Sequence, residues 1–139
     1  MFNSQVHTII LTRLLVDLYK DPYLQSALGF KGGTAAFIFY NLPRFSVDLD
    51  FDLLNPAKKE LVFERVKSVL EKFGTLTEAV EKRYTLFFLL SYEKGQRNIK
   101  VEISKRSNLA EYELKGYLGI SMLVMKQDFM AASKLSRQN

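Results

Sequence analysis

The sequence predicts an α+β fold, a mixed α/β arrangement in which one β-sheet is layered with helices. Segments with the 3.6-residue period of an amphipathic helix alternate with short segments in which every second residue is apolar. No repeat, low-complexity tract or Pro/Ser-rich linker interrupts this alternation. Because 139 residues with 47% hydrophobic content can bury one core, we expect a single domain spanning residues 1–139.

The elements can be assigned in chain order from these periods. Residues 4–20 are expected to form an amphipathic helix, and a turn at 31–34 should lead into an apolar helix at 34–40 that Thr34 caps. An acidic strand is expected at 45–53. A helix at 57–73, which Gly74 ends, should then be followed by strands near 75–80 and at 84–92, 98–104 and 115–124, and by a helix at 126–137.

Composition excludes several functional classes. The chain has no cysteine, which excludes disulfides, Cys-zinc sites and thiol chemistry and suits a cytoplasmic protein. Its one histidine, His7, falls on the first expected helix as a structural or solvated residue, and a His-based metal site or triad is excluded by count. No apolar run approaches the roughly 20 residues of a membrane span, and the N-terminus lacks a signal-peptide pattern, so no membrane partner is expected.

The expected acidic strand carries the most specific signal. Asp48, Asp50 and Asp52 alternate with apolar residues, so they should share one face of the strand. Asp48 and Asp50 would stand about 7 Å apart at the backbone. Their carboxylates can then converge on paired Mg²⁺ ions, which lie about 3.5 to 4 Å apart in phosphoryl-transfer sites. The alternative is an ordinary solvated face, and Asp52, near Asn55-Pro56, can be read as the start of a turn.

A glycine turn precedes this strand. Gly32 and Gly33 let the backbone bend tightly and approach a ligand closely. The exposed amides at the start of the following helix, with Lys31 beside them, favour a phosphate group. Arg44, which follows Pro43, can contact a nucleotide phosphate in a bidentate manner or pair with one of the carboxylates, and the sequence leaves both interpretations open.

Together, the run Lys31-Gly32-Gly33-Thr34, a short helix and the run Arg44-Phe45-Ser46-x-Asp48-Leu49-Asp50-Phe51 resemble the AbiEii/AbiGii abortive-infection toxins, within the DNA polymerase β-like nucleotidyltransferase superfamily. The resemblance implies a nucleotidyltransferase-like mixed sheet and an enzyme that needs Mg²⁺ or Mn²⁺. It also implies transfer of a nucleotide from a nucleoside triphosphate to an RNA acceptor such as tRNA, in a phage-defence system with a cognate antitoxin protein. By the same resemblance, Lys31, Ser46, Asp48 and Asp50 are active-site positions, and both aspartates bind the metal.

Two later segments extend the same scheme. Residues 98–104 alternate, so Glu102 can add a third carboxylate as a catalytic and metal-binding residue; the alternative is a solvent-facing glutamate between Lys100 and Lys105. Lys134 is catalytic by resemblance, because the family has a lysine after a similar small-residue helix. Without the resemblance, Lys134 is an ordinary charge near a helix C-terminus.

The charge balance leaves the partner open. Twenty basic and 15 acidic residues give a net charge of +5, which is compatible with binding RNA but also with an ordinary soluble surface. The resemblance implies a further Arg- and Asp-bearing helical segment that does not follow Asn139 in this sequence. A catalytically incomplete module that binds a nucleotide or a partner protein is therefore the alternative to an active nucleotidyltransferase.

Overall fold

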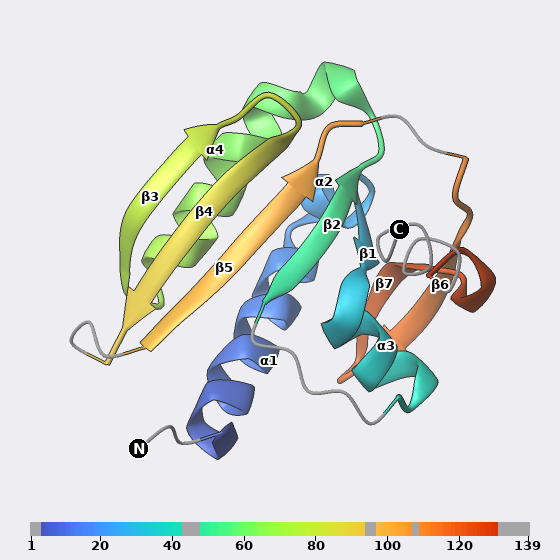
Figure 1. Ribbon diagram of the computed structural model, residues 1–139, viewed down its shortest axis with the longest axis horizontal. Coiled ribbons are helices and arrows are strands. Elements are labelled where there is room, and N and C mark those ends of the chain that lie inside the picture. The colour runs from blue at the N-terminus through green and yellow to red at the C-terminus, as the bar shows by residue number, and fades with distance from the viewer. Residues whose placement is uncertain (1–3, 43–47, 94–96, 107–108, 131–139) are drawn as a thin grey trace, which may run out of the picture.

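The computed structural model describes residues 4–42, 48–93, 97–106 and 109–130. These residues form a seven-stranded mixed sheet in the order β3-β4-β5-β2-β1-β7-β6 (Figure 1). The strands are β1 Leu28–Lys31, β2 Leu49–Leu53, β3 Thr75–Glu81, β4 Thr85–Tyr92, β5 Arg97–Ser104, β6 Tyr112–Tyr117 and β7 Ile120–Met125. The pairs β2–β5 and β1–β7 are parallel, and the other neighbours are antiparallel.

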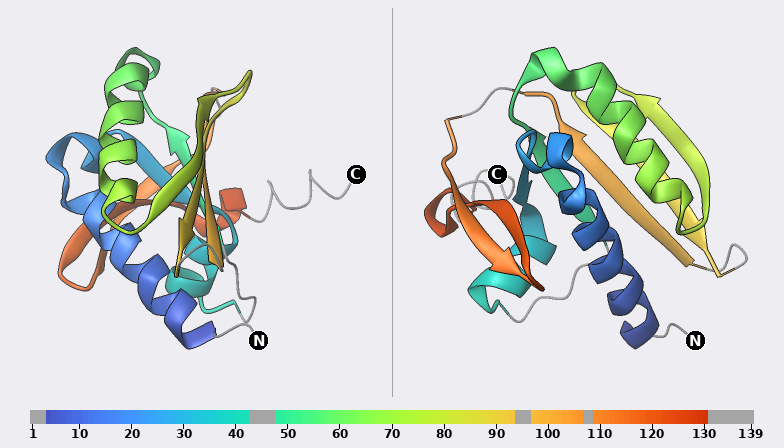
Figure 2. Two further views of the ribbon diagram at one scale, coloured as in Figure 1. Left: turned by 90° about the vertical axis from the view of Figure 1, so that its left-hand side faces the viewer. Right: turned by 180° about the vertical axis from the view of Figure 1, so that it is seen from behind.

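The helices give the sheet one covered face and one open face. The helical elements are α1 Ser4–Lys20, α2 Pro22–Gln25, α3 Gly32–Tyr40, the 3₁₀-helix η1 Pro56–Lys58 and α4 Lys59–Glu71. Helices α1 and α4 lie together behind the sheet in Figure 1 and in front of it in the reverse view of Figure 2. No described helix crosses β4, β5 and β2 on the opposite face (Figures 1 and 2). The expected mixed sheet packed with helices is confirmed.

The core lies between the sheet and the two long helices because the strand alternation sends apolar side chains to that face. Leu49 and Phe51 of β2 are fully buried, as is Phe88 of β4. The ring of Phe63 from α4 packs on Phe88 with centroids 4.9 Å apart. Burial of each such side chain contributes about 1.5 to 3 kcal/mol, which is enough to fix which face of the sheet the polar residues occupy.

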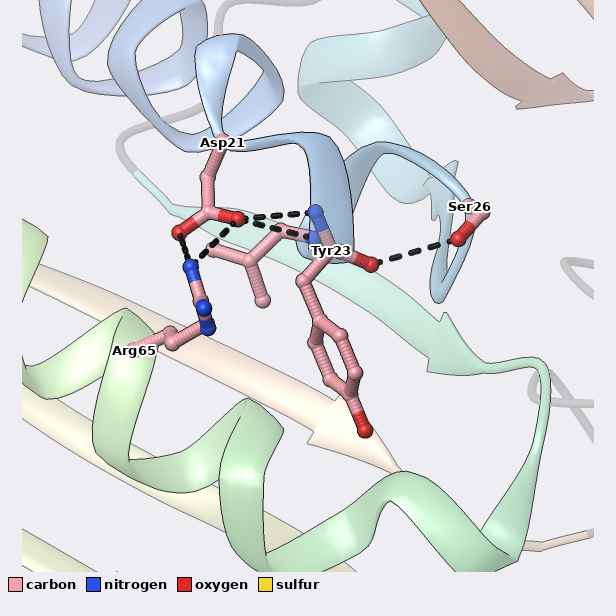
Figure 3. A network of polar contacts seen from close by, with 5 residues as sticks. Asp21, Tyr23, Ser26 and Arg65 are labelled. Carbon is pink, nitrogen blue, oxygen red and sulfur yellow. Dashed lines mark hydrogen bonds and ion pairs between the residues drawn. The ribbon is translucent and has the colours of Figure 1, made fainter.

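A polar clamp joins α2 to α4 (Figure 3). The Asp21 carboxylate accepts hydrogen bonds from the amides of Tyr23 at 2.8 Å and Leu24 at 3.3 Å, so it caps α2. Nη1 of Arg65 donates to both oxygens of Asp21, at 3.1 and 2.9 Å. Partial burial raises the pKa of Asp21, but the hydrogen bonds from Arg65 and from the amides outweigh it and lower the pKa below the ordinary 3.8.

Most expected elements occur, with one error of topology. The helix expected at 57–73 is divided into η1 and α4, and the helix expected at 126–137 is helical at 127–130, where the described residues end. The single strand expected at 115–124 is wrong, because β6 and β7 form an antiparallel hairpin there. Its turn has positive φ at Leu118 (51°) and Gly119 (78°), the geometry of a two-residue primed turn. Leucine at the first of these positions hides the turn in the sequence.

His7 is a buried structural residue, which is one of the two interpretations expected from the sequence. The ring is 1% exposed, and Nδ1 lies 2.5 Å from the hydroxyl of Tyr92, which belongs to β4. No described helix has the length and apolar character needed to cross a membrane.

Candidate active site

Three neighbouring strands bring the expected charged residues into one row on the open face of the sheet. Lys31 of β1 pairs in register with Asp50 of β2, and Asp50 pairs with Glu102 of β5. Asp48 and Asp52 share this face, because side chains alternate along β2. The row lies in an open pocket of about 420 Å³. Its lining residues are Lys31, Asp48, Asp50, Phe51, Tyr84, Thr85, Lys100, Glu102, Ser104 and Arg106.

The glycine turn lies directly against this row. Gly32 has φ of +86°, a conformation that residues with a Cβ rarely adopt. A Cβ at Gly32 would also stand 2.7 Å from Oδ2 of Asp50, closer than real contacts allow. Helix α3 begins at Gly32, two residues earlier than expected. The start of α3, with its amides that have no partner within the helix, is therefore adjacent to the carboxylate of Asp50.

The expectation that Thr34 caps α3 is wrong. The N-cap position is Lys31, which makes no side-chain capping bond, and Thr34 lies inside the first turn with 4% exposure. Its hydroxyl donates instead to the backbone carbonyl of Asp48, at 2.5 Å. Thr34 thus ties the start of α3 to the residue that enters β2, and it fixes where Asp48 stands relative to the turn.

Asp52 is buried and makes contacts that its place in the sequence does not indicate. It lies inside β2 and is 2% exposed, so the interpretation as the start of a turn is wrong. One carboxylate oxygen is 2.7 Å from Nζ of Lys31, and the other accepts a hydrogen bond from the hydroxyl of Tyr112 on β6. The Tyr112 ring passes over Gly29, where a Cβ would overlap it. Gly29 is the register partner of Asp52, a pairing that the sequence does not reveal.

Lys100 stands among the carboxylates of the pocket. Its Nζ is 3.2 Å from Oε1 of Glu102 and 3.7 Å from Oδ2 of Asp48. Hydrogen bonding to Glu102 is the main cause that raises the pKa of Lys100, and the charges of Asp48, Glu102 and Asp50 add to it. Glu102 is thus partly exposed and contacts Lys100 within the pocket. Lys105, the other lysine near it in sequence, pairs instead with Glu81 at 2.7 Å.

The donor set of the pocket fits a divalent cation by its chemistry. Asp48, Asp50 and Glu102 offer carboxylate oxygens, which Mg²⁺ prefers, on adjacent strands of one face. Among the residues that the structure describes, no three acidic or histidine side chains form a closed metal-binding group. The positive charge found between Asp48 and Glu102 is the amine of Lys100.

An aromatic and basic pair lies in the same pocket. The guanidinium of Arg106 stacks on the ring of Tyr84, with 3.8 Å from Cζ to the ring centroid. Tyr84 is 44% exposed, and the backbone carbonyl of Tyr84 accepts a hydrogen bond from the amide of Lys105 at 2.8 Å. The two side chains present a flat, positively charged surface within the pocket that holds the carboxylates. Sequence periodicity gave no sign of this pair, which joins the residue before β4 to the second residue after β5.

Three of the expected site residues lie outside the described residues: Arg44, Ser46 and Lys134. The structure brings together Lys31, Asp48, Asp50 and Glu102, with Gly32 against Asp50.

The sequence matches the model of one known protein family over most of its length. Residues 13–136 match the family described as nucleotidyl transferase AbiEii toxin, Type IV TA system. The chain belongs to the AbiEii family. The matched range contains the whole row of charged residues described above, and it confirms the resemblance carried by residues 31–52.

Solved structures agree with this family. The AbiEii chain is similar to the crystal structure of JHP933 from Helicobacter pylori, with a TM-score of 0.65 and 25% identity over 97% of this chain and 58% of that one. It is also similar to a structure described as a nucleotidyltransferase from H. pylori, with a TM-score of 0.62 and 25% identity over 96% of this chain and 59% of that one. The chain thus spans a little under three fifths of the length of both structures. No curated protein matches the sequence significantly.

Proposed function

We propose that this chain carries the nucleotidyl-transfer site of a toxin in a toxin-antitoxin system, which moves a nucleotide from a nucleoside triphosphate to a hydroxyl group of an RNA. The observation that carries the proposal is the row formed by Asp50 and Glu102 on paired strands, with the start of α3 against Asp50. Family membership supports the same reaction class.

The phosphate-binding half of the site is the turn at the start of α3. The amides of Gly32 and Gly33 lie in the first turn of a nine-residue helix, where backbone amides carry partial positive charge. Lys31 adds a full charge and is oriented by its ion pair with Asp52. Arg44, which lies outside the described residues, is the further phosphate contact in this proposal.

The carboxylates form the other half. Asp48, Asp50 and Glu102 would hold Mg²⁺, which when bound neutralises charge on the phosphate oxygens. Glu102 is our proposed acceptor for the proton of the attacking hydroxyl. The hydroxyl oxygen forms a bond to the α-phosphorus, the bond to the bridging oxygen breaks, and pyrophosphate leaves. Positioning and charge supply most of the catalysis in such reactions.

The flat pair of Tyr84 and Arg106 supports a nucleic-acid ligand in the same pocket. Stacking of a base on an exposed aromatic ring contributes about 1 to 3 kcal/mol, and a guanidinium beside it suits a phosphate backbone. We therefore assign the acceptor, a tRNA or another RNA, to this part of the pocket. A cognate antitoxin protein is the partner that the family implies.

The test is transfer by a variant that lacks both central charges. Asp48→Asn combined with Asp50→Asn should abolish Mg²⁺-dependent incorporation of labelled nucleotide, measured with each nucleoside triphosphate with and without total tRNA. The control is Asp128→Asn, which changes an exposed aspartate outside the pocket and should leave incorporation unchanged.

Two results would count against the proposal. Full activity of the double variant would refute the mechanism. Binding of nucleotide by the unaltered chain without any incorporation would support the alternative, a binding module of the same fold.

A further inference from the structure

Lys100 lies between two of the carboxylates that are proposed to hold the metal. Lys100 lies level with Asp48 across the parallel β2–β5 pair, since the next residues, Leu49 and Val101, are register partners. Its amine contacts Asp48 on one strand and Glu102 on its own strand. We propose that Lys100 is a built-in counter-cation that neutralises the metal-binding carboxylates until a divalent ion displaces it, and that it thereby sets the metal affinity.

Electrostatics explains why the pocket needs such a group. Asp48, Asp50 and Glu102 share one face of neighbouring strands, where carboxylates repel each other unless a cation lies between them. Lys100 lines the same pocket and bridges two of the three. The amine therefore allows the acids to stay together in the absence of metal.

The contacts of Lys100 differ from those of an ordinary surface ion pair. The carboxylate of Glu81, for comparison, forms ion pairs with two lysines, Lys59 at 2.9 Å and Lys105 at 2.7 Å. The single amine of Lys100 contacts two carboxylates, those of Asp48 and Glu102, and both are proposed to hold the metal. A divalent ion that binds Asp48 and Glu102 would compete with the amine, because both cations are attracted to the same two carboxylates.

The inference rests on the proposed function, since it assumes that the carboxylates bind a metal. Mn²⁺ serves as the probe, and its binding is measured by electron paramagnetic resonance without substrate. Lys100→Met should bind Mn²⁺ about tenfold more tightly than the unaltered chain, because a competing positive charge is removed from the site. Lys59→Met, which removes the same charge and leaves Glu81 paired with Lys105, should not change the affinity.

The outcomes separate the two ideas. Equal Mn²⁺ affinity of the unaltered chain and Lys100→Met, with binding lost in the Asp48→Asn/Asp50→Asn variant, would overturn the role of Lys100 and leave the proposed function standing. Binding that is unaffected by the two aspartate changes would overturn the proposed metal site itself. Tighter Mn²⁺ binding by Lys100→Met, together with loss of binding in the aspartate double variant, supports both the role of Lys100 and the proposed metal site.

A second measurement uses the unaltered chain and so does not depend on folding of the variant. Reductive methylation of lysines, followed by mass spectrometry, reports how accessible each amine is. Saturating Mg²⁺ should increase the methylation rate of Lys100 about threefold or more, because the amine leaves its two carboxylates. The rate at Lys59 serves as the internal control. An unchanged rate at Lys100 with Mg²⁺ bound would overturn the inference.

Discussion

The ion pair between Lys31 and Asp52 predicts a large and coupled loss of stability when it is broken. The two side chains are 17% and 3% exposed, and the atoms are 2.7 Å apart. Loss of one partner of a buried pair costs about 3 to 5 kcal/mol. Because Lys31 keeps some contact with water, we expect Asp52→Asn to lower the free energy of unfolding by about 2 to 3 kcal/mol.

A double-mutant cycle measures this coupling directly. The free energy of unfolding is obtained from urea denaturation of Asp52→Asn, Lys31→Met and the double variant. The double variant should be about as stable as either single one, with a coupling near 2 kcal/mol, since the second change removes an already unpaired group. The control is the exposed pair of Lys126 and Glu111 at 3.0 Å, for which we expect at most about 0.5 kcal/mol. Equal coupling in the two cycles would refute the reasoning.

Two further predictions concern the supports of the site. Gly29→Ala should destabilise the fold by about 1 to 3 kcal/mol in urea denaturation, because its Cβ would displace the ring of Tyr112, whereas Gly116→Ala, which meets nothing within 4 Å, should stay within about 0.5 kcal/mol. The lowered pKa of Asp21 means that its pairing stabilises the fold above the ordinary pKa of 3.8 and that this stability is lost as the pH falls through the folded-state pKa. Arg65→Met should therefore flatten the decline of the urea midpoint below pH 4, and an unchanged slope would contradict this.

The parts of the site that sequence reasoning located are those set by local periodicity. Asp48 and Asp50 share one face of their segment, and Glu102 lies on the polar face of another segment, because both segments alternate with a period of two. The glycine turn was also found, because Gly32 needs a conformation that few other residues adopt. These inferences require no knowledge of which strands are neighbours.

The missed features depend on contacts between distant parts of the chain. The partners of Asp52 come from β1 and β6. The amine of Lys100 on β5 contacts Asp48, the residue before the neighbouring strand β2. Thr34 satisfies its hydroxyl with the carbonyl of Asp48, which no capping rule within one helix predicts. Neither propensity nor spacing contains such pairings, because they are fixed only when the strand order is known.

The strand order of this sheet also has a consequence for synthesis on the ribosome. Strand β5 inserts between β4 and β2, so the carboxylate row joins segments made early and late in translation. Parallel pairing of β2 with β5 requires that the later strand has already been made. It also requires the long intervening chain to close into a loop, which slows the pairing. A nascent polypeptide that has not yet exposed β5 thus lacks the assembled row of carboxylates, so the proposed metal site forms only after residues 97–104 have been made.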